Sequence, residues 1–117
     1  MKDYKKYIIK KNHHISKLIS KKISTANRFF IVYKNTHQFE HFRYAISVGK
    51  KYGNAVERNR IKRQIRHIMT KISREIRTNY DILVIIRPNA KNLTFLELES
   101  YLKSVMEKAK LIVREDK

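Results

Sequence analysis

The side chains best suited to chemistry in this 117-residue chain are seven Lys and Arg in the segment 50–67, KKYGNAVERNRIKRQIRH. Guanidinium groups bind phosphate as a planar fork, and ammonium groups bind it as point charges. Residues 58–66 hold five of these cations and no acid. Cations four residues apart on a helix repel one another, and phosphates between them would relieve that repulsion. The segment is therefore predicted to bind a polyanion.

A helix must position these cations, and the segment carries the signals for one. Gly53 and Asn54 predict a turn, and Asn54 with Glu57 three residues later has the pattern of a capping box. Apolar residues follow at spacings of four, three and four, which predicts one buried stripe: Ile61, Ile65, Ile68 and Ile72. At about 100° per residue, the cations from residue 60 onward fall opposite that stripe. Arg58 falls near its edge, where it could pair with a carboxylate or reach a ligand.

A charged helix face is usually only a solvated face, and a mixed-sign face would favour that interpretation. This face has one sign. The whole chain has 28 Lys and Arg against 10 Asp and Glu, a net charge of +18, so nucleic acid and an anionic membrane surface are the two candidate partners. An interfacial helix needs an apolar face free for lipid, and here the core needs that face. Nucleic acid is the favoured partner, and no membrane association is expected.

Other sequence features indicate the cellular compartment and the number of domains. The chain has no apolar run of 18 residues, and its start lacks the pattern of a secretory signal. It has no cysteine, which fits a reducing compartment and excludes disulfides and thiolate-bound zinc. We expect a cytoplasmic protein. Neither repeats nor linkers divide the chain, so residues 1–117 are expected to form one domain.

Apolar patterning predicts an α+β fold of order α-β-β-α-β-α. The helices are expected over 12–22, from Asn54 onward, and from the capping-box pattern of Thr94 and Glu97 to about Ile112. Strands are expected over 28–34, 42–48 and 80–88. The first two are predicted to pair as a hairpin through the loop near 35–41. The third is nearly all apolar and is predicted to be central, buried on both faces.

The segment also has a specific likeness. Residues Lys50, Lys51, Gly53, Asn54, Ala55, Val56, Arg58, Asn59, Arg60, Lys62, Arg63 and Arg66 closely resemble the signature of the bacterial ribonuclease P protein subunit. The resemblance extends through ANRFFIVY (26–33), FRYAISV (42–48) and YDILVIIRP (80–88). It implies a two-layer sandwich with a core of about four strands and a left-handed β-α-β crossover.

The resemblance also implies a function. The family's enzyme hydrolyses the 5′ leader from precursor tRNA, and metal ions held by its catalytic RNA do the chemistry. The protein is then an accessory subunit without catalytic residues or a metal site of its own; magnesium is expected through the RNA. Its partners are the catalytic RNA and precursor tRNA, with no homo-oligomer expected. The residues implied to bind the catalytic RNA are Lys50, Lys51, Arg58, Asn59, Arg60, Lys62, Arg63 and Arg66.

A cleft between the first helix and the sheet is implied to hold the leader. The residues predicted for it are Ile15, Ile19, Phe29, Ile31, Tyr33, Ala45 and Ser47. Tyr33 is the best candidate to stack on a base, with Phe29 and Ile31 expected on the same strand face, although such aromatics are more often core. Small Ala45 and Ser47 could admit a nucleotide or could lie under a helix. The family usually has aromatics where this chain has Ile15 and Ile19.

Two other functional classes are compatible with the composition. A ribosomal-type RNA-binding module would fit the size and charge equally well. A nuclease acting without RNA is disfavoured, because the ten acids form no evident cluster for two-metal catalysis. The histidines at 13, 14, 37 and 41 lack the spacing and the carboxylates of a catalytic zinc site.

Overall fold

Three α-helices and four β-strands make up most of the chain in the computed structural model, which describes residues 4–10, 12–20 and 23–113. In chain order the elements are η1 (Tyr4–Tyr7), α1 (Asn12–Ser20), β1 (Ser24–Ala26), β2 (Phe30–Thr36), β3 (Arg43–Val48), η2 (Lys50–Tyr52), α2 (Ala55–Lys71), η3 (Ser73–Glu75), β4 (Tyr80–Ile86), η4 (Pro88–Asn92) and α3 (Phe95–Lys108). Each η is a short 3₁₀ turn. The predicted α+β class is confirmed, with β1 as an additional short strand.

The strands form one sheet in the order β1-β2-β4-β3. β4 lies between β2, to which it is antiparallel, and β3, to which it is parallel. The prediction that β4 is central is confirmed, and the predicted hairpin of the two preceding strands is wrong. An apolar strand such as β4 gains most from two neighbours, because both of its hydrogen-bonding edges and both faces are then withdrawn from water.

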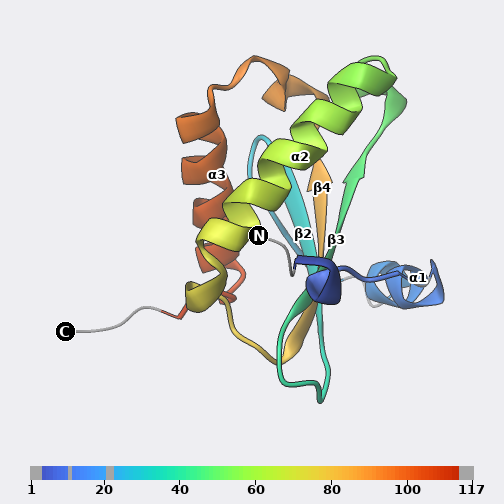
Figure 1. Ribbon diagram of the computed structural model, residues 1–117, viewed down its shortest axis with the longest axis vertical. Helices are drawn as coiled ribbons and strands as arrows, with labels where there is room; N and C mark the ends of the chain where they lie inside the picture. The colour runs from blue at the N-terminus through green and yellow to red at the C-terminus, as the bar shows by residue number, and fades with distance from the viewer. Residues whose placement is uncertain (1–3, 11, 21–22, 114–117) are drawn as a thin grey trace.

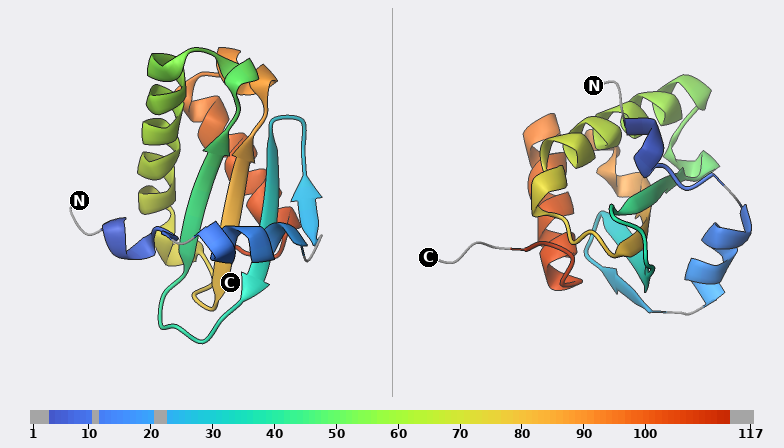
Figure 2. Two further views of the ribbon diagram at one scale, coloured as in Figure 1. Left: turned by 90° about the vertical axis from the view of Figure 1, so that its right-hand side faces the viewer. Right: turned by 60° about the horizontal axis from the view of Figure 1, so that its bottom comes forward.

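The connection from β3 through α2 to β4 joins parallel strands, and Figures 1 and 2 show that it is left-handed. Such crossovers are right-handed in the great majority of proteins. The left-handed crossover implied by the sequence resemblance is therefore confirmed. It brings the N-terminal end of α2 to the same end of the sheet at which β3 and β4 finish.

α2 and α3 cover one face of the sheet and α1 crosses the other (Figures 1 and 2). The main core lies beneath α2 and α3, and the predicted stripe of α2 is buried there, with each side chain at most 2% exposed: Ile61, Ile65, Ile68 and Ile72. A smaller cluster lies beneath α1, where Leu18 is 1% exposed and packs with Ile9, Ala45 and Leu83. Within the described part of the chain, no helix is long and apolar enough to span a bilayer.

Two boundaries differ from the predicted ones for local reasons. β2 begins at Phe30 because the Asn27 side chain accepts hydrogen bonds from the backbone N–H groups of Phe29 and Phe30, at 3.0 and 2.9 Å, and holds a turn there. α3 ends at Lys108 because Lys110 has a positive φ of 63°, outside the helical range. Residue 22, in the predicted first helix, lies outside the described residues.

Candidate nucleic-acid interface

The N-terminal end of α2 is fixed by the predicted capping box. Asn54 Oδ1 accepts from the Glu57 backbone N–H, and Glu57 Oε1 accepts from the Asn54 backbone N–H, both at 2.9 Å. The bond from Asn54, together with the neighbouring Lys91 ammonium at 3.2 Å, lowers the pKa of the Glu57 carboxyl. The carboxylate also complements the positive end of the helix dipole. The cap therefore sets where the cationic face of α2 starts.

Gly53 makes this cap possible through close approach. A Cβ atom at residue 53 would lie 2.2 Å from Glu57 Oε1, so any side chain there would displace the carboxylate that caps the helix. The carbonyl of Gly53 also accepts a hydrogen bond from Arg58 Nε at 3.1 Å. Arg58 is thus half-buried and bonded to the backbone of the turn, rather than to a carboxylate. Its Nε–H therefore steadies the turn that leads into α2.

We call the residues predicted to bind the catalytic RNA the α2 arc: seven cations and one amide, Lys50, Lys51, Arg58, Asn59, Arg60, Lys62, Arg63 and Arg66. Lys62 and Arg66 are half-buried, and all members other than these two and Arg58 are exposed. Among the described residues, no acid forms an ion pair with Arg60, Lys62 or Arg63. Arg60, Lys62 and Arg63 therefore carry positive charge without an acid partner and have N–H donors suited to an anion.

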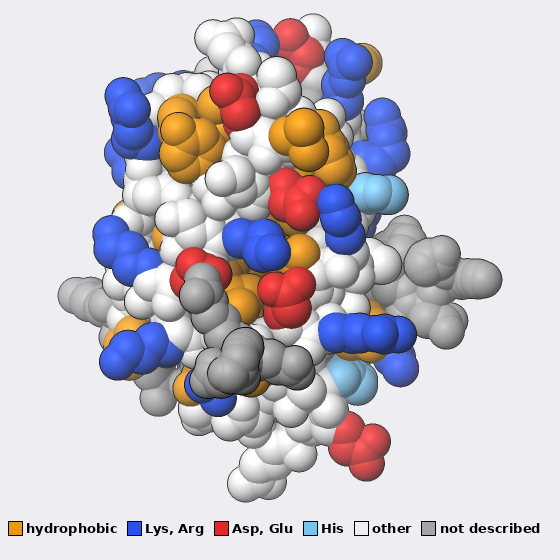
Figure 3. Space-filling model, turned by 90° about the vertical axis from the view of Figure 1, so that its left-hand side faces the viewer, with side chains coloured by type: hydrophobic (Ala, Val, Ile, Leu, Met, Phe, Trp, Pro, Cys, Tyr) orange, Lys and Arg blue, Asp and Glu red, His pale blue; other side chains and the backbone are white. Residues whose placement is uncertain are grey.

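The outer side of α3 has different chemistry. Lys71, at the end of α2, pairs with Glu99 of α3 at 2.9 Å. Lys103 of α3 pairs with Glu75 at 3.5 Å. Figure 3 shows Asp and Glu side chains set among Lys and Arg on this side of the molecule. A groove of about 520 Å³ beside α3 has both Lys71 and Glu99 in its lining. Lysines beside α3 are thus paired with acids, whereas Arg60, Lys62 and Arg63 have no acid partner among the described residues.

The opposite face of the sheet, which we call the α1-side face, carries most of the residues predicted to hold the leader. Tyr33, Leu83 and Ala45 lie in register across β2, β4 and β3, and so share a face. Ala45 packs beneath α1 with Leu18, which confirms the helix-covered alternative for that residue. In the next row, Ser47 is exposed and Ile31 is half-buried, so this row stays open beside α1.

The two aromatic residues predicted for this face, Phe29 and Tyr33, lie in different places. Phe29 is not part of it: the residue precedes β2, is 9% exposed, and packs in the main core with its ring 4.6 Å from that of Tyr101. The expectation that it shares a strand face with Tyr33 is wrong, because the Asn27 turn rotates it away. Tyr33 is half-buried at the edge of the cluster under α1. In α1 itself, Ile15 is half-buried and Ile19 is 46% exposed.

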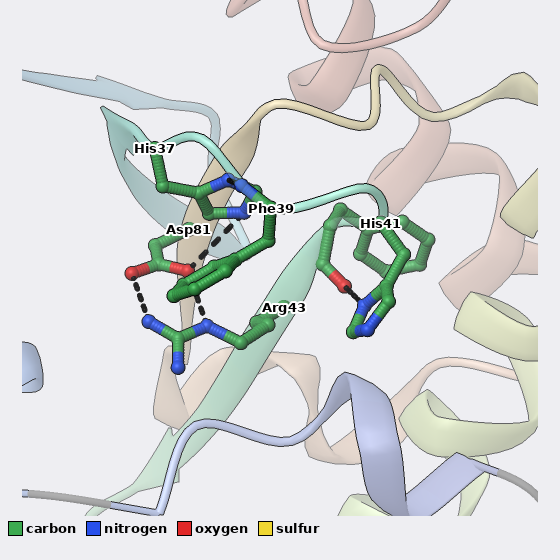
Figure 4. A network of polar contacts seen from close by, with 6 residues as sticks. His37, Phe39, His41, Arg43 and Asp81 are labelled. Atoms are coloured by element: carbon green, nitrogen blue, oxygen red, sulfur yellow. Dashed lines mark hydrogen bonds and ion pairs between the residues drawn. The ribbon is translucent and has the colours of Figure 1, made fainter.

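A buried ionic network, which was not predicted, lies at one end of the α1-side face, where β4 begins (Figure 4). Asp81 is 8% exposed and accepts two hydrogen bonds from Arg43, Nε to Oδ1 at 2.9 Å and Nη2 to Oδ2 at 2.8 Å. The Arg43 guanidinium lies 4.5 Å from the ring centroid of Phe39, and His37 Nε2 lies 3.6 Å from Asp81 Oδ1. The signal in the sequence was an acid opening an apolar strand, which requires a buried partner.

The histidines in this region have structural contacts. His41 Nδ1 lies 3.0 Å from the Phe42 carbonyl, and its ring is 5.0 Å from that of Tyr7. His37 Nδ1 accepts from the Phe39 backbone N–H at 3.1 Å. Across the described ranges, no three His, Cys, Asp or Glu side chains are grouped so as to hold a metal ion. The side chain of His13 lies outside the described residues.

Comparison with known proteins decides the family. A model for the family described as ribonuclease P matches residues 4–110. The chain belongs to the ribonuclease P protein family. The ribonuclease P protein component of Staphylococcus haemolyticus is 47% identical over 92% of this chain and 93% of that protein. That of Acholeplasma laidlawii is 38% identical over 93% of this chain and 94% of the relative.

Solved ribonuclease P proteins have the same fold. A Staphylococcus aureus RNase P protein mutant with defective mRNA degradation activity superposes with a TM-score of 0.86 at 43% identity, covering 92% of each chain. The RNase P protein of Thermotoga maritima superposes with a TM-score of 0.80 at 23% identity, covering 86% of this chain and 94% of that one, and so supports the fold alone. The family predicted from the signature is confirmed.

Proposed function

We propose that this chain is the protein subunit of a ribonucleoprotein ribonuclease P, which removes the 5′ leader from precursor tRNA. The observation that carries the proposal is the α2 arc. Its cations repel one another, and Arg60, Lys62 and Arg63 have no acid partner among the described residues. An RNA whose phosphates fill this surface would offset the repulsion and release counterions.

In this proposal the arc docks on the catalytic RNA. Arg60 and Arg63 supply exposed planar forks suited to phosphate oxygens, and Lys62 supplies a point charge. Arg58 contributes the donors left after its bond to Gly53. Lys50 and Lys51, on the turn before α2, extend the arc toward the ends of β3 and β4. In this proposal the chain supplies no nucleophile and no metal ligand; magnesium held by the RNA would supply the activated water.

The α1-side face holds the leader in the same proposal. A single strand of varied sequence is best bound by flat apolar side chains beside cations, since every base offers a π-face. Tyr33, Ile31 and Ser47 provide such a surface beside α1, and Ile15 and Ile19 provide apolar contact where stacking rings are absent. Ala45 supports α1 from below. Phe29, buried against Tyr101, acts only through the core.

Reconstitution tests the proposal. The cognate catalytic RNA is assayed on precursor tRNA at low magnesium, with and without the chain, and the chain is assayed alone. We expect no cleavage by the chain alone and a clear gain when it is added to the RNA. Equal cleavage with and without the chain would refute the proposal. Preferential recovery of ribosomal RNA in a pull-down would instead favour an RNA-binding module.

A variant of Tyr33 tests separately the proposal that the α1-side face binds the leader. Tyr33→Ala is expected to leave assembly with the catalytic RNA unchanged and to weaken the complex with precursor tRNA relative to mature tRNA by about tenfold, the value of roughly one lost stacking contact. The measurement is the ratio of the two dissociation constants. An unchanged ratio would mean that the ring serves only the cluster beneath α1.

A further inference from the structure

A pocket of about 240 Å³ adjoins the α2 arc, between the first turns of α2 and the η4 turn. Its apolar wall is formed by Ile61 and Leu93. Its polar lining comes from three elements and comprises Tyr52, Glu57, Arg60, Gln64 and Lys91. Arg60 therefore belongs both to this pocket and to the arc.

Tyr52 lines this pocket with a hydroxyl that has no partner among the described residues. The residue is only 6% exposed and lines the pocket, and its hydroxyl forms no hydrogen bond with any described residue. Burial, and then the nearby Glu57 carboxylate, raise the pKa of the phenol, so it stays protonated and available as a donor at neutral pH. A hydroxyl at a pocket wall without a protein partner is available to donate to a water or a ligand there. Gln64 is also half-buried, and none of the described residues bonds its amide.

The lining selects among possible ligands. At about 240 Å³ the pocket is smaller than the roughly 300–1,000 Å³ of sites for drug-sized molecules, so it has room for one ring system. A bare phosphate would meet the Glu57 carboxylate, whose Oε2 lies 3.2 Å from Lys91 Nζ. A flat heterocycle suits it better: the apolar wall contacts the face of the ring, and Gln64, Tyr52 and Glu57 offer donors and acceptors to its edge.

We propose that this pocket receives a single unstacked nucleobase of the catalytic RNA. The inference rests on the proposed function, since the RNA that docks on the arc delivers the base past Arg60. RNA bases are recognised in this way when a loop or bulge presents them unpaired, by contact with the ring face and hydrogen bonds to the edge. The arc then binds the backbone, and the pocket fixes which part of the RNA lies on it.

The test compares Tyr52→Phe, which removes only the hydroxyl, and Gln64→Ala with the wild-type chain. Tyr101→Phe, a partly exposed tyrosine on α3, is the matched control. Dissociation constants for the catalytic RNA are measured over a series of salt concentrations. Each pocket variant is expected to bind about fivefold more weakly, as for one lost hydrogen bond, with the salt slope unchanged because no phosphate contact is lost. Tyr101→Phe is expected to bind as the wild type does.

Base-specific chemical probing of the RNA supplies the second readout. We expect one base to be protected by the wild-type chain and by Tyr101→Phe, and to become reactive with both pocket variants while the backbone footprint persists. Wild-type affinity and protection in both pocket variants would overturn the inference, as would protection of a base in precursor tRNA alone. If the wild-type chain itself fails to bind or activate the catalytic RNA, the proposed function fails. If it activates the RNA and the variants match it, only the pocket inference fails.

Discussion

α2 and α3 are two helices built alike that face solvent with opposite chemistry. Each begins with a capping box, Asn54 with Glu57 and Thr94 with Glu97, and each buries an apolar stripe against the same side of the sheet. On α2, Arg60, Lys62 and Arg63 have no acid partner among the described residues. Beside α3, lysines pair with Glu75 and Glu99.

The difference separates what the fold requires from what the function requires. Caps and stripes are the same in both helices because both must begin and pack in the same way. Exposed ion pairs such as those beside α3 contribute little to stability, about 0–1 kcal/mol. Unpaired like charges four residues apart cost stability instead. A surface that retains them is therefore expected to be completed by a polyanion.

Charge reversal is expected to give the largest contrast between the two helices. Arg63→Glu on α2 and Lys103→Glu on α3 change the net charge equally, so a long-range effect of charge cancels in the comparison. We expect Arg63→Glu to weaken binding to the catalytic RNA by roughly 10- to 100-fold, because a phosphate contact becomes a repulsion. Lys103→Glu should change it by less than about threefold. Equal losses, measured by filter binding, would remove the distinction.

Neutralisation should sharpen the contrast with a smaller effect. Arg60→Ala and Arg63→Ala are each expected to reduce the slope of log affinity against log salt by about one, the signature of one lost phosphate contact. Lys103→Ala is the control and should keep the wild-type slope. A weaker affinity with an unchanged slope for both arginine variants would assign them to packing or folding rather than to phosphate binding.

The caps should behave alike in the two helices. Asn54→Ala and Thr94→Ala each remove a side-chain acceptor for a backbone N–H at the third helical residue, and each should lower the free energy of unfolding by about 1 kcal/mol. Urea unfolding without RNA measures this. A loss for Thr94→Ala without one for Asn54→Ala would mean that the α2 cap belongs to the RNA site rather than to the fold.

The α2 cap also predicts a pH effect. The pKa of the Glu57 carboxyl is lowered below its ordinary value of 4.5, so its contribution to stability is present above about pH 4.5 and is lost as pH falls through the folded-state pKa. Thermal unfolding between pH 6 and 3 should show a shallower decline for Glu57→Gln than for the wild type. Parallel curves would show that the cap does not depend on the charge.

Local signals in the sequence predicted α2 almost completely. The cap at Asn54, the buried stripe and the exposed cations depend on spacings within one helix, and the structure has them as expected. The central place of β4 followed from its composition. The resemblance to the family supplied the handedness of the crossover, which spacing alone would not have given.

What the sequence did not predict depends on contacts between distant segments. The position of β4 between β2 and β3 depends on the whole sheet, so the closeness of β2 and β3 in the chain wrongly favoured a hairpin between them. Phe29 turns into the core because Asn27 caps a turn and Tyr101, far along the chain, packs on it. The Arg43–Asp81 pair joins residues 38 apart. The pocket beside Tyr52 could not be predicted, because residues from three separate elements line it.

The most direct test of the account is turnover of the reconstituted enzyme with the α2 arc reversed in charge. Cleavage of precursor tRNA at low magnesium is compared for the catalytic RNA alone, with the wild-type chain, and with a folded Arg60→Glu, Arg63→Glu variant. The account predicts that the variant falls to about the rate of the RNA alone and that added magnesium narrows the gap. Wild-type turnover with the reversed arc would contradict it.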